Sequence, residues 1–241
     1  MKNVIIITLA GIIFLSFSTK ESSRSFSEMK ALALIENLEH EEHVFGIDFS
    51  HYSGEVVWDS LSHKEKDISF IFLRATYGID VDFRYCSNIE EALCREYLVG
   101  SYHYFRPNEC GDVQAQNYLN TISHSDQHFL PVLDIERIHS DVTSKELRKE
   151  LQVWLSLVEN ELCVKPIIYS NLKFWKTYIR DFPEFDAYPL WIAAYSVDKR
   201  KKEVMEFAHI YQFSDREKVT GIPKKVDGNF ITKEKFLTLL R

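Results

Sequence analysis

From residue 45 onward the chain repeats one pattern, in which a short apolar run rich in β-branched and aromatic residues precedes an amphipathic stretch. Such short runs predict buried strands, and the amphipathic stretches predict helices. Alternation of the two elements predicts an α/β fold with a largely parallel sheet. We expect eight strands, at 45–50, 68–76, 98–105, 128–136, 166–171, 189–195, 209–214 and 225–231. We expect five helices, at 89–97, 112–123, 144–162, 172–178 and 198–207, and a shorter one at 58–64.

Eight strands favour a barrel, but the distance between successive strand starts becomes shorter along the chain. The last two intervals are 20 and 16 residues, whereas a strand–helix–strand unit needs about 30 residues. The connection at 214–225 therefore has room only for a turn or a hairpin. We predict a single irregular TIM-like β/α barrel with eight strands and about five helices. We expect it to be incomplete, with most helices in its first part and mainly strands in its last part.

The amino-terminal residues predict export. Lys2 precedes an apolar run at 4–17, and small residues follow at the spacing of a signal-peptidase site. The run is shorter than the roughly 20 residues of a membrane span, although an uncleaved anchor is the alternative. We interpret 1–18 as a signal peptide, 19–43 as a polar spacer or docking helix, and 44–241 as the barrel domain.

Charge and missing motifs argue against several classes of function. The chain has 29 basic and 36 acidic residues, a net charge of −7, so its overall field does not favour a nucleic acid as partner. No glycine-rich phosphate loop occurs, so we expect no nucleotide. The histidines form no metal-ligand pattern, and we expect neither a metal nor a cofactor. We also expect a monomer.

Four cysteines, an even number, allow one or two disulfides in an exported chain. Their spacing matches no zinc motif, and three complete pairings are open. We interpret them as buried or paired structural thiols. They are Cys86, Cys94, Cys110 and Cys163.

Acidic residues stand in several expected strands, and the carboxyl ends of barrel strands form the rim where function collects. These acids are Asp48, Asp134, Glu136 and Asp227. Asp134 and Glu136 are two residues apart, so in a strand both side chains point to one face. Mutual repulsion and partial desolvation would raise the pKa of one of them. A protonated acid beside an ionised partner is the machinery of a glycosidase, whereas acids that merely meet water or cap a helix are the alternative.

Aromatic residues occur in or just after the expected strands, where sugar rings could stack on them. Each one singly is more often part of a core. Tyr102 and Tyr104 share one strand face, and His103 and Phe105 share the other, so only one pair can face inward. The further aromatic candidates are Tyr52, Trp58, Tyr77, Trp191, Tyr195 and Tyr211.

Seven segments resemble, in order, glycoside hydrolase family 25, the Chalaropsis-type lysozymes. They are GIDFSH at 46–51, FLRATYG at 72–78, GSYHYFRP at 100–107, DIE at 134–136, IYS at 168–170, LWIAAY at 190–195 and VDGN at 226–229. The resemblance covers about residues 45–231. It implies a barrel of eight strands with about five helices and N-acetylmuramidase activity, which cuts the β-1,4 bond from N-acetylmuramic acid to N-acetylglucosamine in peptidoglycan.

By matching position, the resemblance makes Glu136 the general acid and Asp134 its partner. Asp48 and Asp227 would complete an acidic mouth, with Tyr169 and Trp191 near the sugar. The chain departs from many relatives at Ser53, where they have Gln, and at Tyr211, where they have Trp. These departures concern the fit of the substrate more than the chemistry.

Two further residues are candidates for binding substrate. Tyr102 would face the cleft if its side of the strand points inward. Arg74 stands at the end of an expected strand and could bond to the acidic cluster. A structural ion pair is the interpretation we favour for Arg74 over direct contact with substrate.

For the mechanism we prefer retention of configuration with help from the substrate. The 2-acetamido oxygen would attack the anomeric carbon while Glu136 protonates the leaving oxygen and Asp134 orients the amide. A covalent Asp nucleophile and an inverting route are the alternatives. Rival functions are a glycan-binding surface protein that has lost turnover, a purely structural surface domain and an enzyme that cleaves chitin.

Overall fold

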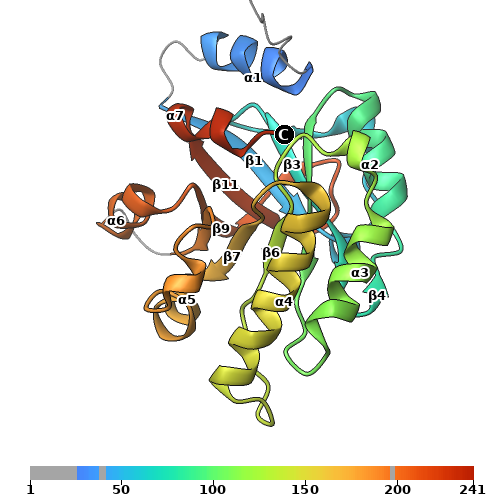
Figure 1. The fold of residues 1–241 in the computed structure, drawn as a ribbon. Coiled ribbons are helices and arrows are strands. Elements are labelled where there is room, and N and C mark those ends of the chain that lie inside the picture. Colours follow the sequence, from blue (N-terminus) through green and yellow to red (C-terminus); the bar gives the residue numbers. More distant parts are fainter. Residues whose placement is uncertain (1–25, 38–41, 196–198) are drawn as a thin grey trace, which may run out of the picture.

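The computed structural model describes residues 26–37, 42–195 and 199–241, and Figure 1 shows their arrangement. The signal peptide predicted at 1–18 lies outside the described residues. The strands are β1 (His43–Phe49), β2 (Ser62–His63), β3 (Phe70–Tyr77), β4 (Asp80–Val81), β5 (Leu98–Tyr104), β6 (Val132–Asp134), β7 (Ile167–Asn171), β8 (Leu190–Ala193), β9 (Ile210–Glu217), β10 (Val219–Thr220) and β11 (Val226–Thr232). The helices are α1 (Phe26–Asn37), α2 (Tyr85–Cys94), α3 (Gly111–Thr121), α4 (Ser144–Leu162), α5 (Leu172–Tyr178), α6 (Lys199–Phe207) and α7 (Lys233–Phe236).

Eight strands close into a barrel in the order β1, β3, β5, β6, β7, β8, β9, β11, and β11 pairs back with β1. The first seven run parallel to one another. β11 is antiparallel to both of its neighbours. The barrel with eight strands is therefore confirmed, and the connection from β9 to β11 is the hairpin that its short length predicted. The strand ring is complete, so the barrel is incomplete only in its outer layer of helices.

Helices α2 to α6 correspond to the five predicted helices, and α4 has the predicted bounds. Thr143 caps α4 by accepting from the backbone N–H of Glu146, whose side chain accepts in return from the backbone of Thr143. The helix expected at 58–64 is wrong, because only Trp58–Ser60 form a 3-10 turn before β2. The connection from β1 to β3 thus lacks an α-helix as well.

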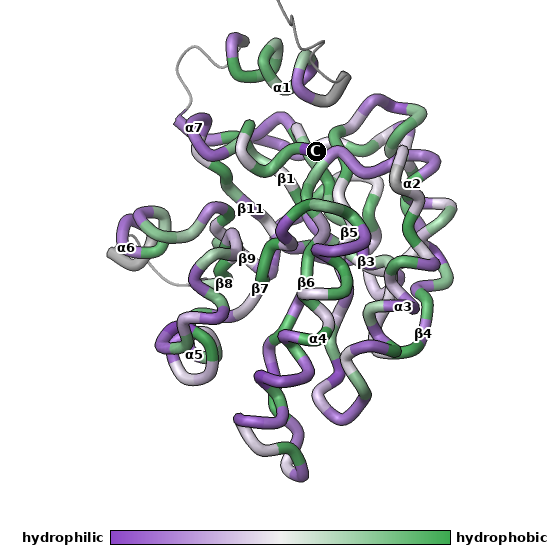
Figure 2. Tube along the Cα trace, viewed as in Figure 1, coloured by the Kyte–Doolittle hydropathy of each residue, from purple (hydrophilic) through white to green (hydrophobic). Residues whose placement is uncertain are grey.

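Alternating side chains of the strands supply two apolar layers. Ile71 and Leu73 of β3 pack outward against the helices, whereas Phe70 and Phe72 of the same strand point into the barrel. Hydrophobic stretches accordingly follow the barrel strands, and hydrophilic stretches lie on the outer elements (Figure 2). Side chains of α1 pack against the inner layer, and Ala31 is completely buried there.

The four cysteines are free and exposed, so the prediction of buried or paired thiols is wrong. Cys86 and Cys94 lie on α2, Cys110 precedes α3 and Cys163 ends α4. All four side chains therefore face solvent, on or at the ends of the outer helices, and none belongs to the apolar layers. Of the helices in the described part of the chain, none has the length and apolar character needed to cross a membrane.

Candidate active site

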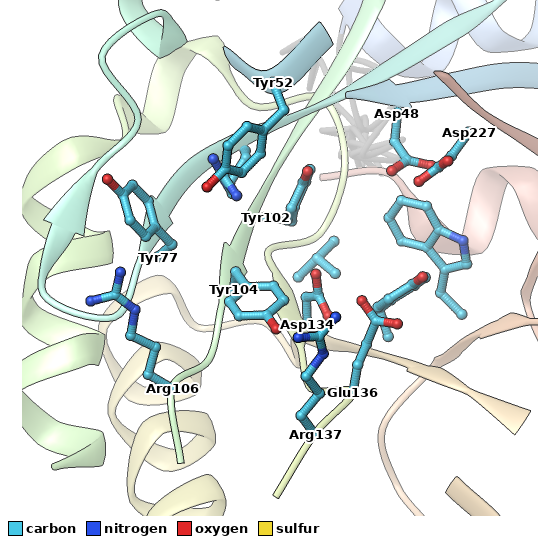
Figure 3. Close-up of a pocket in the computed structure, with 14 residues that line it drawn as sticks. Asp48, Tyr52, Tyr77, Tyr102, Tyr104, Arg106, Asp134, Glu136, Arg137 and Asp227 are labelled. Carbon is cyan, nitrogen blue, oxygen red and sulfur yellow. The ribbon is translucent and has the colours of Figure 1, made fainter. Parts of the chain in front are cut away.

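A cavity of about 450 Å³ opens at the rim formed by the carboxyl ends of the parallel strands (Figure 3). Its volume lies in the range of pockets that bind small ligands. All eight residues predicted for the site line this cavity, namely Asp48, Arg74, Tyr102, Asp134, Glu136, Tyr169, Trp191 and Asp227. Tyr52, Tyr77, Tyr104, Arg106, Val132 and Arg137 complete the lining. Residues from seven strands and their following loops thus meet in one hollow, and their roles stay predictions.

Asp227 reaches this rim because its strand runs in the opposite direction. It is the second residue of β11 and lies opposite Asp48, which is close to the end of β1. In a fully parallel barrel the start of a strand would be at the far opening. The antiparallel pairing therefore brings the two carboxyl groups together (Figure 3).

Asp48 and Asp227 form a hydrogen-bonded pair of carboxyls. Asp48 Oδ2 accepts from Asn229 Nδ2 at 2.7 Å and from Gln212 Nε2 at 2.9 Å. Burial raises the pKa of Asp48 to about 6, against the effect of these two donors. Burial and the neighbouring Asp48 charge raise the pKa of Asp227 to about 9. At neutral pH the pair therefore holds one proton and one negative charge.

Asp134 and Glu136 both line the cavity, as the alternation of strand side chains predicts, and Ile135 between them is buried in the outer apolar layer. Burial and then the charge of Glu136 raise the pKa of Asp134 well above its usual value. Burial also raises the pKa of Glu136, while Arg137 opposes this rise. Asp134 Oδ1 is buried and has no hydrogen-bond partner among the described residues. Burial therefore favours the protonated form of both carboxyls, and Asp134 Oδ1 is a buried acceptor that no described residue satisfies.

The two faces of β5 are separated as predicted. Tyr102 and Tyr104 face the cavity. His103 faces the helices, where its Nε2 lies 3.1 Å from Gln114 Oε1 and its ring stacks on Trp154 with 5.4 Å between centroids. Burial lowers the pKa of His103 to about 3, so it is a neutral core residue.

Of the other aromatic candidates, Tyr169 and Trp191 form an edge-to-face pair in the cavity wall, with centroids 5.0 Å apart. Trp58, Phe105 and Tyr211 are buried outside the lining. They are therefore part of the core, which is the more frequent place for a single aromatic residue.

Gln212 and Asn229 are site residues that the sequence reasoning missed. Gln212 Oε1 accepts from the hydroxyls of Tyr169, at 2.8 Å, and Tyr195. Its Nε2 donates to Asp48 and, at 3.4 Å, to Asp227. Asn229 Oδ1 accepts from Trp191 Nε1 at 2.9 Å. Asn229 lies two residues after Asp227 in the VDGN segment, and Gln212 directly follows Tyr211. From the sequence we considered both segments, but for Asp227 and Tyr211 only.

Arg74 bonds to Asp82 and not to the acidic cluster. Its Nε lies 3.1 Å from Asp82 Oδ2, and both side chains are buried. The guanidinium carbon lies over the rings of Tyr52 and Tyr77, at 5.0 and 4.7 Å from their centroids. The favoured structural ion pair is thus present, and Arg74 also contacts the two tyrosine rings that line the cavity beside it.

In the described part of the chain no group of three or more His, Cys, Asp or Glu residues is placed to hold a metal ion.

Residues 47–222 match the family model of glycosyl hydrolases family 25. The protein YegX of Escherichia coli strain K12 is 34% identical over 190 residues, which cover 77% of this chain and 68% of YegX. Lysozyme M1 of Streptomyces globisporus is 28% identical over 198 residues, which cover 77% of this chain and 67% of its own.

Two solved structures have a similar fold. The bacterial lysozyme of Streptomyces coelicolor matches with a TM-score of 0.69 at 25% identity, over 81% of this chain and 96% of that protein. A family 25 glycosyl hydrolase of Bacillus anthracis matches in fold with a TM-score of 0.67 at 24% identity, over 83% and 98% of the two chains. The family match spans most of the barrel and includes Asp48, Asp134 and Glu136, whereas Asp227 lies beyond its end. This chain therefore belongs to glycosyl hydrolases family 25 and is a glycoside hydrolase.

Proposed function

We propose that this protein is a lysozyme that hydrolyses the β-1,4 bond between N-acetylmuramic acid and N-acetylglucosamine in peptidoglycan. The family and the lysozymes among its relatives support this substrate class. The observation that carries the proposal is the position of Asp134 and Glu136, which line one cavity of sugar-binding size beside aromatic rings. An acid that retains its proton near neutral pH is what cleavage of a glycosidic bond requires.

Glu136 is the general acid in this proposal. Its burial raises its pKa and so favours the protonated form, which can donate its proton to the leaving oxygen. It is the second residue after β6 and is less buried than Asp134, so its carboxyl is nearer to the opening of the cavity. The proton is therefore held where a glycosidic oxygen can reach it.

Asp134 orients the 2-acetamido group of the substrate. Its Oδ1 lacks a partner among the described residues, and an amide N–H placed there would satisfy it. A donor to this oxygen favours the ionised form of Asp134. Because the two carboxyls repel one another, ionised Asp134 keeps the remaining proton on Glu136. Binding of the substrate thus prepares both groups at once.

The reaction then proceeds with retention of configuration. The acetamido oxygen attacks the anomeric carbon, Glu136 protonates the leaving oxygen, and Asp134 stabilises the amide as it becomes positively charged. In the second step water opens the cyclic intermediate, and Glu136 takes up its proton. No ester with the enzyme forms.

The experiment compares the native protein with Glu136→Gln on purified cell walls. We expect loss of turbidity and new reducing ends with the native protein, and a fall in rate of at least about 100-fold with the variant, as for removal of a general acid. Mass spectrometry of the products should show muramic acid at the reducing end. Native protein that binds walls without releasing ends would instead be a glycan-binding protein, and cleavage of chitooligosaccharides alone would identify a chitinase.

We also propose that the chain is exported and acts as a monomer. The apolar run at 4–17 and the wall substrate support export. Amino-terminal sequencing of secreted protein should find a start near residue 19. Light scattering should give the mass of one chain.

A further inference from the structure

Three arginines line the cavity, and two of them have acidic partners within the chain. Arg74 is paired with Asp82. Arg106 Nη1 lies 2.9 Å from Asp80 and 3.1 Å from Glu109. The charges of these two guanidinium groups are therefore largely compensated, and both also stack on the ring of Tyr77.

Arg137 is different, because no described residue forms an ion pair or a hydrogen bond with its side chain. It follows Glu136 in the chain, its side chain is exposed, and it lines the same cavity. Figure 3 shows its guanidinium reaching toward the region of Asp134 and Glu136. Its charge opposes the rise in the pKa of Glu136 and of the Tyr104 hydroxyl, which places the cation in the electrostatic field of the site.

Four carboxyl groups line the cavity around Arg137, and the Asp48–Asp227 pair keeps one negative charge at neutral pH. The charges of Arg74 and Arg106, in contrast, are compensated by their own partners. Such a lining repels a substrate that carries carboxylates. A neutral glycan such as chitin would need no cation here. N-Acetylmuramic acid has a carboxyl on its lactyl ether, which is free in a strand without peptides. In a strand with peptides this carboxyl is an amide, and the peptide carries carboxylates instead.

We propose that Arg137 binds a carboxylate of the glycan strand and thereby selects strands that contain muramic acid over neutral ones. This inference rests on the proposed lysozyme activity and names the part of the substrate that the site recognises. A guanidinium presents paired N–H donors that match a carboxylate, and such charged hydrogen bonds are stronger than neutral ones. Arg137 adjoins the general acid, so the carboxylate it binds is on the lactyl ether, or on the peptide, of a muramic acid next to the bond that is cut.

The test measures kcat and KM for the native protein and for Arg137→Gln and Arg137→Lys on three soluble glycans. The first is peptide-bearing peptidoglycan, and the second is the same glycan after an amidase has removed the peptides. The third is the peptide-free glycan with its lactyl carboxyls converted to methylamides. Arg216→Gln removes an exposed arginine outside the cavity and is the matched control.

We expect Arg137→Gln to raise KM about tenfold on a glycan with carboxylates, as for loss of one charged hydrogen bond at an exposed site. On the methylamide glycan it should match the native protein, and Arg137→Lys should recover part of the loss. A loss on the peptide-free glycan identifies the lactyl carboxylate, and a loss confined to peptide-bearing glycan identifies the peptide.

Two results would overturn the inference. Equal KM values for native protein and Arg137→Gln on all three glycans would show that the guanidinium binds no carboxylate. An equal loss on all three, with a shifted pH profile, would show that Arg137 acts only through the pKa of Glu136. Failure of the proposed function is distinguishable, because the native protein would then release no reducing ends from any of the glycans.

Discussion

Substitution of Gln212 by methionine tests whether one buried amide holds the acidic side of the cavity together. Gln212 is 1% exposed, and its side chain takes part in four hydrogen bonds. Methionine has a similar length and no amide. The substitution therefore removes these bonds without leaving a large cavity.

The expected loss in the free energy of unfolding follows from the groups whose hydrogen bonds the substitution removes. Tyr169 is buried, so its hydroxyl would lack an acceptor, and Asp48 would lose one of its two amide donors. Tyr195 is half-exposed, so water replaces its bond, and the 3.4 Å contact to Asp227 is weak. An unsatisfied buried group costs about 1–3 kcal/mol, so we expect a loss of about 3 kcal/mol in the free energy of unfolding. For a chain of this size that lowers Tm by about 6–12 °C.

The assay is thermal unfolding followed by circular dichroism, with Gln127→Met as the matched control. Gln127 is also buried, but within the described part of the chain its side chain makes a single hydrogen bond, from Nε2 to the Tyr85 hydroxyl at 3.1 Å, and its Oε1 has no partner. We expect the control to lose about 1 kcal/mol or less. If both variants lower Tm by the same amount, the hydrogen bonds of Gln212 do not stabilise the site as argued.

Two other predictions concern buried charges. The pKa values of the Asp48–Asp227 pair are raised from 3.8 to about 6 and about 9, so the folded protein binds more protons than the unfolded chain between about pH 4 and about pH 9. Stability should therefore fall as pH rises through this range, and Asp227→Asn should reduce the fall in Tm between pH 5 and pH 8; an unchanged slope would contradict the shared proton. Asp82→Ala should lower the free energy of unfolding by about 3–5 kcal/mol, measured with urea, because it leaves buried Arg74 unpaired. Asp181→Ala, which breaks an exposed pair, is its control and should have no measurable effect; similar losses in both variants would refute the argument.

Some of the site could be predicted because it depends on local geometry. Asp134 and Glu136 share a face for the same reason that Tyr102 and Tyr104 do, since side chains alternate along any strand. The bounds of α4 were equally predictable, because Thr143 and its capping box stand in the sequence. The cysteines were not predictable in this way, since their exposure depends on which side of each helix meets the barrel.

By itself, the sequence determined the order of the barrel strands and outer helices, which side chains share a strand face, and the resemblance to a lysozyme family. These properties depend on residues that are neighbours along the chain. The short connection at 214–225 already predicted a hairpin, but only the tertiary structure decided that β11 also pairs with β1, in the register that places Asp227 opposite Asp48. It also decided that Gln212 joins both acids to Tyr169 and that Arg74 has a partner while Arg137 has none among the described residues. The physical reason is that strand pairing joins residues far apart in the chain, so the direction of one strand changes which side chains meet.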